Sequence, residues 1–111
     1  MISPVSVQRL ERNVSWSGDA LAAFCKKHGI ARLAVFGSAT RDGFTTSNDV
    51  DVLVSFKPGR TPGLFDLVRM ERELSNTVFN GKAIDLRTPD DLSRYFRSEV
   101  LASAVYLHDE G

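Results

Sequence analysis

Residues Gly37 to Val54 read GSATRDGFTTSNDVDVLV, a glycine-serine turn followed by a strand that carries two acidic residues. The valines at positions 50, 52 and 54 alternate with the residues between them, which is the period of a strand with one face toward a core. Asp49 and Asp51 therefore share the opposite face. A pair of carboxylates on an apolar strand indicates a chemical role, because a core gains nothing from charged groups beside it.

The segments before the turn predict one helix and one strand. A helix is expected from Asp19, its cap, to Lys27, and His28 with Gly29 supplies the stop. A short strand follows over residues 31–36 and ends at the glycine of the turn. The polar residues from 39 to 48 predict a helical turn followed by a loop.

The segments after the acidic strand predict two helices and a third strand. Residues 57–60 form a turn, and Thr61 with Pro62 is expected to cap and begin a helix that ends near residue 81. The strand over residues 82–87 places Asp85 on the face opposite to Ile84 and Leu86. A final helix is expected from residue 88, with apolar residues at 92, 96, 100 and 104.

These elements predict an α/β (α+β) fold with a short mixed sheet of at least three strands, flanked by helices. We expect residues 1–18 to form a loosely ordered arm, with at most one short helical turn around 7–13, because Pro4 and Gly18 interrupt the pattern. Residues 19–111 are expected to form a single domain, since a chain of 111 residues supports one core. The site is expected on the uncovered face of the sheet.

Composition argues against several classes of partner. Fourteen lysine and arginine residues balance fourteen aspartate and glutamate residues, so no overall field attracts nucleic acid or an anionic membrane. The single cysteine, Cys25, cannot form an internal disulfide, and no run approaches the roughly 20 apolar residues of a membrane span. We therefore expect a soluble cytoplasmic protein that binds neither membrane nor nucleic acid directly.

The acidic residues have the spacing of a metal site. Side chains at i and i+2 of a strand project to the same side, with backbones roughly 6 to 7 Å apart, so Asp49 and Asp51 can converge on one cation. Carboxylates suit Mg²⁺, which also binds substrate phosphates. Two such ions, about 3.5 to 4 Å apart, hold the attacking and leaving oxygens of a displacement at phosphorus. Asp85 is the candidate third carboxylate, which holds the second ion and accepts the proton of an attacking hydroxyl.

The turn upstream has the features of a phosphate site. Gly37 lets the backbone approach a phosphate closely, and Ser38 adds a hydroxyl and an N–H where a helical turn begins. Arg41, in the loop that follows, is a further candidate for a phosphate contact. Together these residues predict a triphosphate cradle beside a pair of metal ions.

The full motif, Gly-Ser, ten residues and Asp-x-Asp, resembles the signature of the DNA polymerase beta-like nucleotidyltransferase superfamily. The short length, the strand over residues 48–54, the later Ala-Ile-Asp-Leu and the ending over 100–107 resemble the minimal nucleotidyltransferases. These proteins are the antitoxins of toxin–antitoxin pairs whose partners are HEPN-domain ribonuclease toxins. The similarity covers roughly residues 20 to 108.

This resemblance implies a role for each motif residue. Gly37 and Ser38 would hold the triphosphate, and Asp49, Asp51 and Asp85 would form the catalytic, metal-binding triad. It further implies transfer of AMP from ATP to a tyrosine hydroxyl of the toxin. The chain departs from the family's usual loop, with Thr40 before Arg41, Asp42 after it and Asn48 before Asp49.

Other interpretations stay open from sequence alone. The two aspartates could lie on an exposed strand face without a metal, Gly37-Ser38 could be a simple turn, and Arg41 could be merely solvated. Lys82 and Arg87 could neutralise triphosphate charge or simply end a strand. The chain could also neutralise its toxin by binding alone, with a vestigial site, or transfer a nucleotide to a small molecule such as an antibiotic.

Overall fold

The computed structural model describes residues 4–41, 43–45, 48–92 and 97–110. In chain order, its helices, 3-10 turns (η) and strands are α1 (Pro4–Asn13), α2 (Gly18–His28), β1 (Ile30–Phe36), η1 (Gly37–Thr40), β2 (Val50–Phe56), α3 (Leu64–Thr77), β3 (Ile84–Arg87), η2 (Pro89–Asp91), α4 (Arg97–Ser103) and β4 (Val105–Asp109). None of the helices in these ranges is long and apolar enough to cross a membrane.

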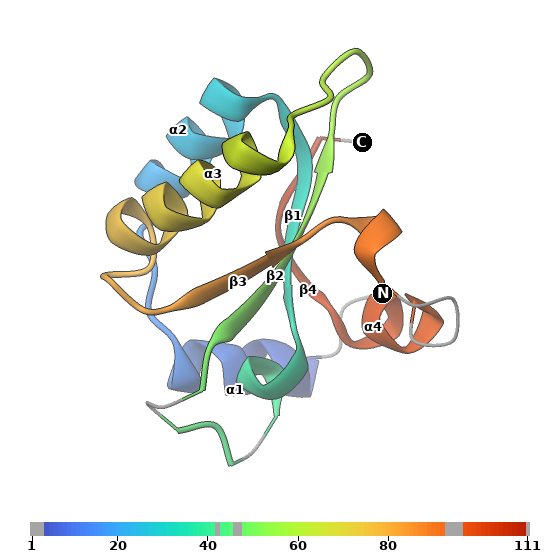
Figure 1. Ribbon diagram of the computed structural model, residues 1–111. Helices are drawn as coiled ribbons and strands as arrows, with labels where there is room; N and C mark the ends of the chain where they lie inside the picture. Colours follow the sequence, from blue (N-terminus) through green and yellow to red (C-terminus); the bar gives the residue numbers. More distant parts are fainter. Residues whose placement is uncertain (1–3, 42, 46–47, 93–96, 111) are drawn as a thin grey trace.

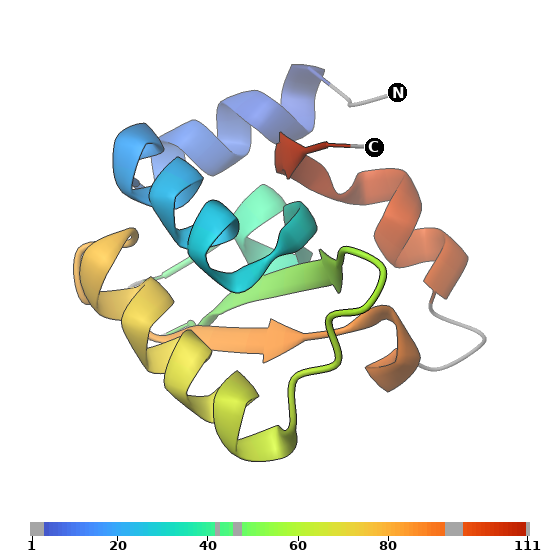
Figure 2. The same cartoon turned by 90° about the horizontal axis from the view of Figure 1, so that it is seen from above.

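The strands form one mixed sheet in the order β3-β2-β1-β4. The mixed sheet of at least three strands confirms the prediction, whereas the sequence did not predict the strand order or the fourth strand. Strand β1 is antiparallel to β2 and β4, and β2 is parallel to β3. Figures 1 and 2 show α2 and α3 side by side on one face of the sheet, with η2 and α4 on the other side. Helix α1 and η1 lie at one end of the sheet, and the turn after β2 lies at the opposite end (Figure 1).

The alternation in β2 places its valines in the core. Val50, Val52 and Val54 are fully buried, together with Leu74 of α3. Leu53 is buried as well, although it lies on the same face as Asp51. The face of the sheet that carries Asp51 is therefore partly covered, because η2 and α4 pack on that side. The sequence predicted an uncovered face, and only the end near η1 is uncovered.

Helix α2 matches the predicted helix, but its cap differs. Ser17, not Asp19, is the N-cap, and its Oγ accepts a hydrogen bond from the backbone N–H of Ala20 at 3.2 Å. Gly29 ends the helix with a φ of 65°, the left-handed conformation that glycine adopts without strain. Cys25 is a buried apolar residue, as predicted, and burial raises the pKa of its thiol to about 11.

The N-terminal residues differ from the expected loosely ordered arm. Helix α1 spans ten residues, and its Leu10 is fully buried in the core. Val14, just after the helix, is buried in the same core. Pro4 stands at the first position of the helix, where its missing N–H removes no helical hydrogen bond. The spacing of Val7, Leu10 and Val14 is a short apolar stripe, which the surrounding polar residues obscure in the sequence.

The later elements also correct two predictions. Helix α3 begins at Leu64 with Gly63 as its N-cap, so Thr61 and Pro62 lie in the preceding loop. The expected final helix is interrupted, because Leu92 has the extended backbone angles φ −82° and ψ 135° after η2. Phe96, one of its expected apolar positions, lies outside the described residues.

The chain ends in a strand that the sequence analysis did not identify. Strand β4 pairs antiparallel with β1, which places Val105 opposite Val35. Ala104, expected on the final helix, comes just after α4, and its N–H donates to the carbonyl of Val100 at 2.9 Å. The spacing of four between apolar residues continues past the end of α4, so periodicity alone does not locate the change from helix to strand.

We expect Leu10→Ala to lower the free energy of unfolding by about 2–5 kcal/mol, because it leaves a cavity in the core. Leu101→Ala is the control, since this leucine on α4 is 43% exposed, and its loss should stay below about 1 kcal/mol. Urea denaturation followed by circular dichroism measures both values. Equal stability of Leu10→Ala and the wild type would show that α1 is not part of the core.

Candidate active site

Two of the three predicted carboxylates are brought together by strand pairing. In the parallel register of β2 and β3, Asp51 lies directly opposite Asp85, and both side chains are half-buried. Asp49 precedes β2 and is exposed. Its charge contributes to the electrostatic environment of Asp51, so the three groups occupy one acidic region.

The environment of Asp51 disfavours its charged form. Burial raises the pKa of Asp51 above its ordinary value of 3.8, the neighbouring Asp85 raises it further, Arg87 lowers it and Asp49 raises it slightly. A carboxylate whose charge is disfavoured by burial and by like charges gains from a bound cation. Asp51 is therefore a partly desolvated carboxylate rather than a freely solvated surface residue, and its role as a cation ligand stays a prediction.

Gly37 lies directly beside the Asp51 carboxylate. Phe36, the last residue of β1, pairs with Asp51, and the chain turns at Gly37 with a φ of 74°. A Cβ added at Gly37 would collide with Oδ2 of Asp51. Glycine is therefore required here both by the backbone conformation and by the space that Asp51 occupies.

The conformation of η1 is stabilised by hydrogen bonds within the turn and by hydrogen bonds from a residue of α1. The buried hydroxyl of Thr40 donates to the carbonyl of Gly37 at 2.8 Å, and the N–H of Arg41 donates to the carbonyl of Ser38 at 3.1 Å. Nδ2 of Asn13, at the end of α1, donates to the carbonyls of Ala39 and Arg41, both at 3.0 Å. Thr40 is one of the residues that differ from the family's usual loop, and its hydroxyl is hydrogen-bonded within the turn.

Asn13 is a residue of the site region that sequence reasoning missed. It lies 26 and 28 residues from its two acceptors, and the N-terminal segment shows no motif that points to η1. The loop after η1 has its own anchor. Oδ1 of Asn48 accepts hydrogen bonds from the N–H and the hydroxyl of Thr45, both at 2.9 Å, which fixes the chain just before Asp49.

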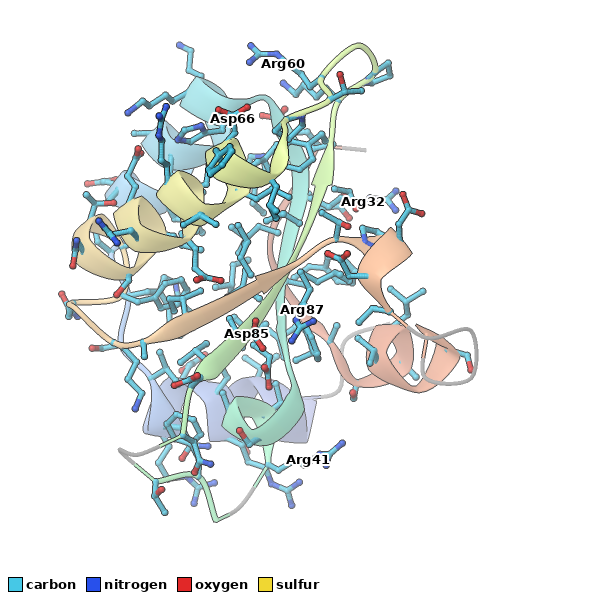
Figure 3. All side chains as sticks on the ribbon, viewed as in Figure 1. Arg32, Arg41, Arg60, Asp66, Asp85 and Arg87 are labelled. Atoms are coloured by element: carbon cyan, nitrogen blue, oxygen red, sulfur yellow. The ribbon has the colours of Figure 1, made fainter. Side chains whose placement is uncertain are left out.

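Arg87 neutralises the third carboxylate. Its Nε and Nη2 donate to Oδ1 and Oδ2 of Asp85, both at 3.1 Å, in the two-point geometry typical of arginine and carboxylate. Figure 3 shows Asp85 and Arg87 together on β3 near the middle of the sheet, with Arg41 beyond η1 at the lower end. Arg87 is therefore paired with a carboxylate rather than being a simple solvated strand end, and its neutralisation of triphosphate charge stays a prediction.

The other predicted residues lie near this region. Ser38 is half-buried in η1, and the exposed side chain of Arg41 makes no hydrogen bond or ion pair with the described residues. Nζ of Lys82 lies 5.0 Å from the ring centroid of Phe44, a cation–π contact. Asp42 lies outside the described residues.

The donor set fits a hard cation, although the carboxylates are not assembled around one. Within residues 4–110, apart from the undescribed positions, no group of three or more His, Cys, Asp or Glu side chains is placed to hold a metal ion. All the candidate donors are carboxylate oxygens, which is the preference of Mg²⁺. Asp49 and Asp51 therefore suit Mg²⁺ by the type of their donor atoms, whereas both oxygens of Asp85 are engaged by Arg87.

Known proteins resemble this chain in sequence and in fold. Residues 19–107 match the family model described as a nucleotidyltransferase domain. A protein of Methanocaldococcus jannaschii, named "Putative protein adenylyltransferase MJ0435", is 35% identical over 79 residues, which are 71% of this chain and 81% of that protein.

Solved structures show the same fold. One described as "Structure of putative minimal nucleotidyltransferase" is 33% identical, with a TM-score of 0.64 over 79% of this chain and 86% of that chain. A second, described as a toxin–antitoxin with AMP-PNP, has a TM-score of 0.67 over 84% of this chain and 73% of that chain. Its identity is 14%, so this second likeness concerns the fold alone.

We expect ATP and Mg²⁺ together to raise the melting temperature of the wild type, and we expect Gly37→Ala to abolish this rise because the new Cβ displaces the Asp51 carboxylate. Gly59→Ala is the matched control, since Gly59 has a φ of 86° and open space around it. Both variants incur the left-handed penalty of about 1–2 kcal/mol, and only Gly37→Ala adds the collision. Thermal unfolding with and without ATP and Mg²⁺ separates them. An unchanged shift in Gly37→Ala would contradict the placement of Asp51 in the site.

We expect Asp51→Asn to be at least as stable as the wild type at pH 7. Because the pKa of Asp51 is raised in the folded state, stability from this group is greatest below pH 3.8 and is lost as pH rises through the raised pKa. At neutral pH the charged group therefore opposes folding. Urea titrations at pH 7 and below pH 3.8 measure the difference, with Asp90→Asn, an exposed aspartate of η2, as the control. A clear loss of stability at pH 7 in Asp51→Asn alone would contradict this assignment.

Proposed function

This chain belongs to the nucleotidyltransferase domain family and is of the minimal type, and from this premise we propose that it is a Mg²⁺-dependent protein adenylyltransferase. We further propose that it is the antitoxin of a toxin–antitoxin pair, with a HEPN-domain ribonuclease toxin as partner. The observation that carries the proposal is the convergence of Asp51, Asp85 and Gly37 at one end of the sheet. The adenylyltransferase relative supports AMP as the transferred group.

The reaction is a displacement at the α-phosphorus of ATP. A tyrosine hydroxyl oxygen of the toxin attacks that phosphorus and forms a new P–O bond, while the bond to the oxygen bridging the α- and β-phosphates breaks. Pyrophosphate leaves, and the hydroxyl proton passes to the carboxylate of Asp85. Mg²⁺, when bound, supplies charge neutralisation for the phosphates and for the leaving oxygen.

The residues of this chain position the reactants. Asp49 and Asp51 supply the oxygen ligands for the metal. Gly37 leaves room for the Asp51 carboxylate, and Ser38 offers its hydroxyl and N–H to the triphosphate. The exposed Arg41 is available to the outer phosphates. Rigid placement of these groups matters because such catalysis depends mainly on positioning and charge stabilisation.

Asp85 is a poor proton acceptor while Arg87 holds it, because both its oxygens receive hydrogen bonds from this cation, which stabilises the charged carboxylate. The negative triphosphate offers Arg87 an alternative partner at the same end of the sheet. Transfer of Arg87 from Asp85 to a phosphate would free the base and neutralise the nucleotide in one movement. Such an exchange gives a functional reason for the position of Arg87 beside Asp85.

The pairing of Asp85 with Arg87 also favours a second candidate, an antitoxin that acts by binding alone with a vestigial site. In that case the ion pair is permanent and only stabilises the end of β3. The two functions differ in one measurement: only a competent site gains a rise in melting temperature that requires both ATP and Mg²⁺.

We expect Asp49→Asn and Asp51→Asn to abolish AMP transfer while both variants stay folded. Each chain is incubated with ATP, Mg²⁺ and the protein encoded by the neighbouring gene, and the intact mass of that protein is measured. The wild type and Asp90→Asn should add one or more AMP units to it. Normal transfer by either site variant would contradict the metal assignment, and a bound but unmodified partner with the wild type would support the binding-only function.

A further inference from the structure

Helix α3 exposes an apolar surface that the fold does not cover. Leu64 is 74% exposed, Phe65 is 81% exposed and Val68 is 51% exposed, and we call these three residues the α3 patch. The opposite side of the same helix is buried, with Met70 and Leu74 in the core. The patch is therefore not the edge of the core but a separate surface, and exposed apolar surfaces of this kind mark interaction sites.

The α3 patch is continuous with the candidate active site. A cavity of about 310 Å³ lies along the seam between α3 and β3. Leu64 and Val68 line it on the helix side, and Asp85 and Arg87 line it on the strand side. A molecule seated on the patch can therefore reach the proposed proton acceptor without leaving the surface of the protein.

The edge of β3 does not favour an extended partner strand. Strand β3 has only four residues, and the backbone N–H of Leu86 donates to Oε2 of Glu71 on α3 at 2.7 Å. This N–H is therefore not available to pair with another chain. A partner on this side must be recognised through side chains, which suits a helix laid along the seam better than an added strand.

The charges beside the patch define the partner further. Arg69 and Arg72 are exposed and line a second hollow of about 380 Å³ together with Phe65, Val68 and Glu73. Glu73 is already paired with Lys27 and His28 of α2. Neither arginine makes a hydrogen bond or ion pair with any residue that the structure describes. A second copy of this chain on the same patch would bring like charges together, because a two-fold interface juxtaposes the same surface. An acidic partner is complementary to them.

We propose that the α3 patch docks the acceptor protein through an amphipathic helix whose apolar stripe is flanked by aspartate or glutamate. The acceptor's hydroxyl then enters the cavity beside Asp85. This inference rests on the proposed adenylyl transfer and adds where the acceptor binds. It predicts that the patch contributes to recognition of the acceptor and not to binding of the nucleotide.

The test compares Phe65→Glu with Leu101→Glu, which changes the 43% exposed leucine of α4 in the same way. AMP transfer to the protein encoded by the neighbouring gene is measured over a range of its concentrations. Phe65→Glu should lower kcat/KM at least tenfold, mainly through KM, while the melting shift with ATP and Mg²⁺ stays that of the wild type. Leu101→Glu should stay within twofold. A partial return of activity in Phe65→Glu when acidic residues of the acceptor helix are changed to lysine would further support the assignment.

The outcomes separate this inference from the proposed function. Normal kinetics in Phe65→Glu would overturn the docking surface and leave adenylyl transfer standing. If the wild type does not modify the neighbouring protein, the proposed adenylyl transfer to that protein is wrong. Calorimetry then measures whether the same protein binds at the α3 patch. Binding weakened at least tenfold by Phe65→Glu supports the surface, and absent or unchanged binding overturns it. A wild-type dimer in sedimentation that Phe65→Glu dissociates would also overturn it, because the patch would then be covered by a second copy.

Discussion

A half-buried carboxylate on a central strand is the constraint on which this site depends. Removing a charged group from water is costly, and Asp51 has another acid, Asp85, opposite it in the register. Two residues accommodate this acidic pair. Gly37 leaves space for the carboxylate of Asp51, and the guanidinium of Arg87 pairs with Asp85. The guanidinium of Arg87 therefore supplies positive charge beside the two acids, whereas the proposed reaction takes its positive charge from bound Mg²⁺.

The topology explains why the helix beside the site is α3. Strands β2 and β3 are parallel neighbours, so the chain must cross from the end of one to the start of the other, and α3 makes that crossing. One face of the helix then fills the core with Met70 and Leu74, and its start lies close to the end of β3. The same connection that pairs Asp51 with Asp85 thus brings an exposed apolar surface to the site.

The sequence predicted the parts of this arrangement that depend on local pattern. The alternation of Val50, Val52 and Val54 located β2 and its two faces, and the same argument placed Asp85 opposite Ile84 and Leu86. The turn at Gly37 was predicted from composition. The assignments of Asp49, Asp51 and Asp85 to metal, and of Gly37, Ser38 and Arg41 to the triphosphate, stay predictions.

The parts that could not be predicted depend on contacts between distant residues. Pairing of β4 with β1 gives the C-terminal residues a strand conformation that their helical spacing did not suggest. The two-point contact of Arg87 with Asp85 depends on how that end of β3 is folded, so sequence alone left solvation and charge neutralisation open. The burial of Leu10 depends on the surface that α1 meets, which no local pattern reveals.

The hydrogen bonds from Asn13 to η1 have a consequence for where the functional unit begins. The family similarity starts at residue 19, yet the support of the glycine-serine turn comes from a side chain six positions earlier, on a helix outside the shared region. The turn of the predicted phosphate site is therefore supported by a residue that the family model does not include. A substitution on α1 can alter the shape of this turn while every residue of the motif stays the same.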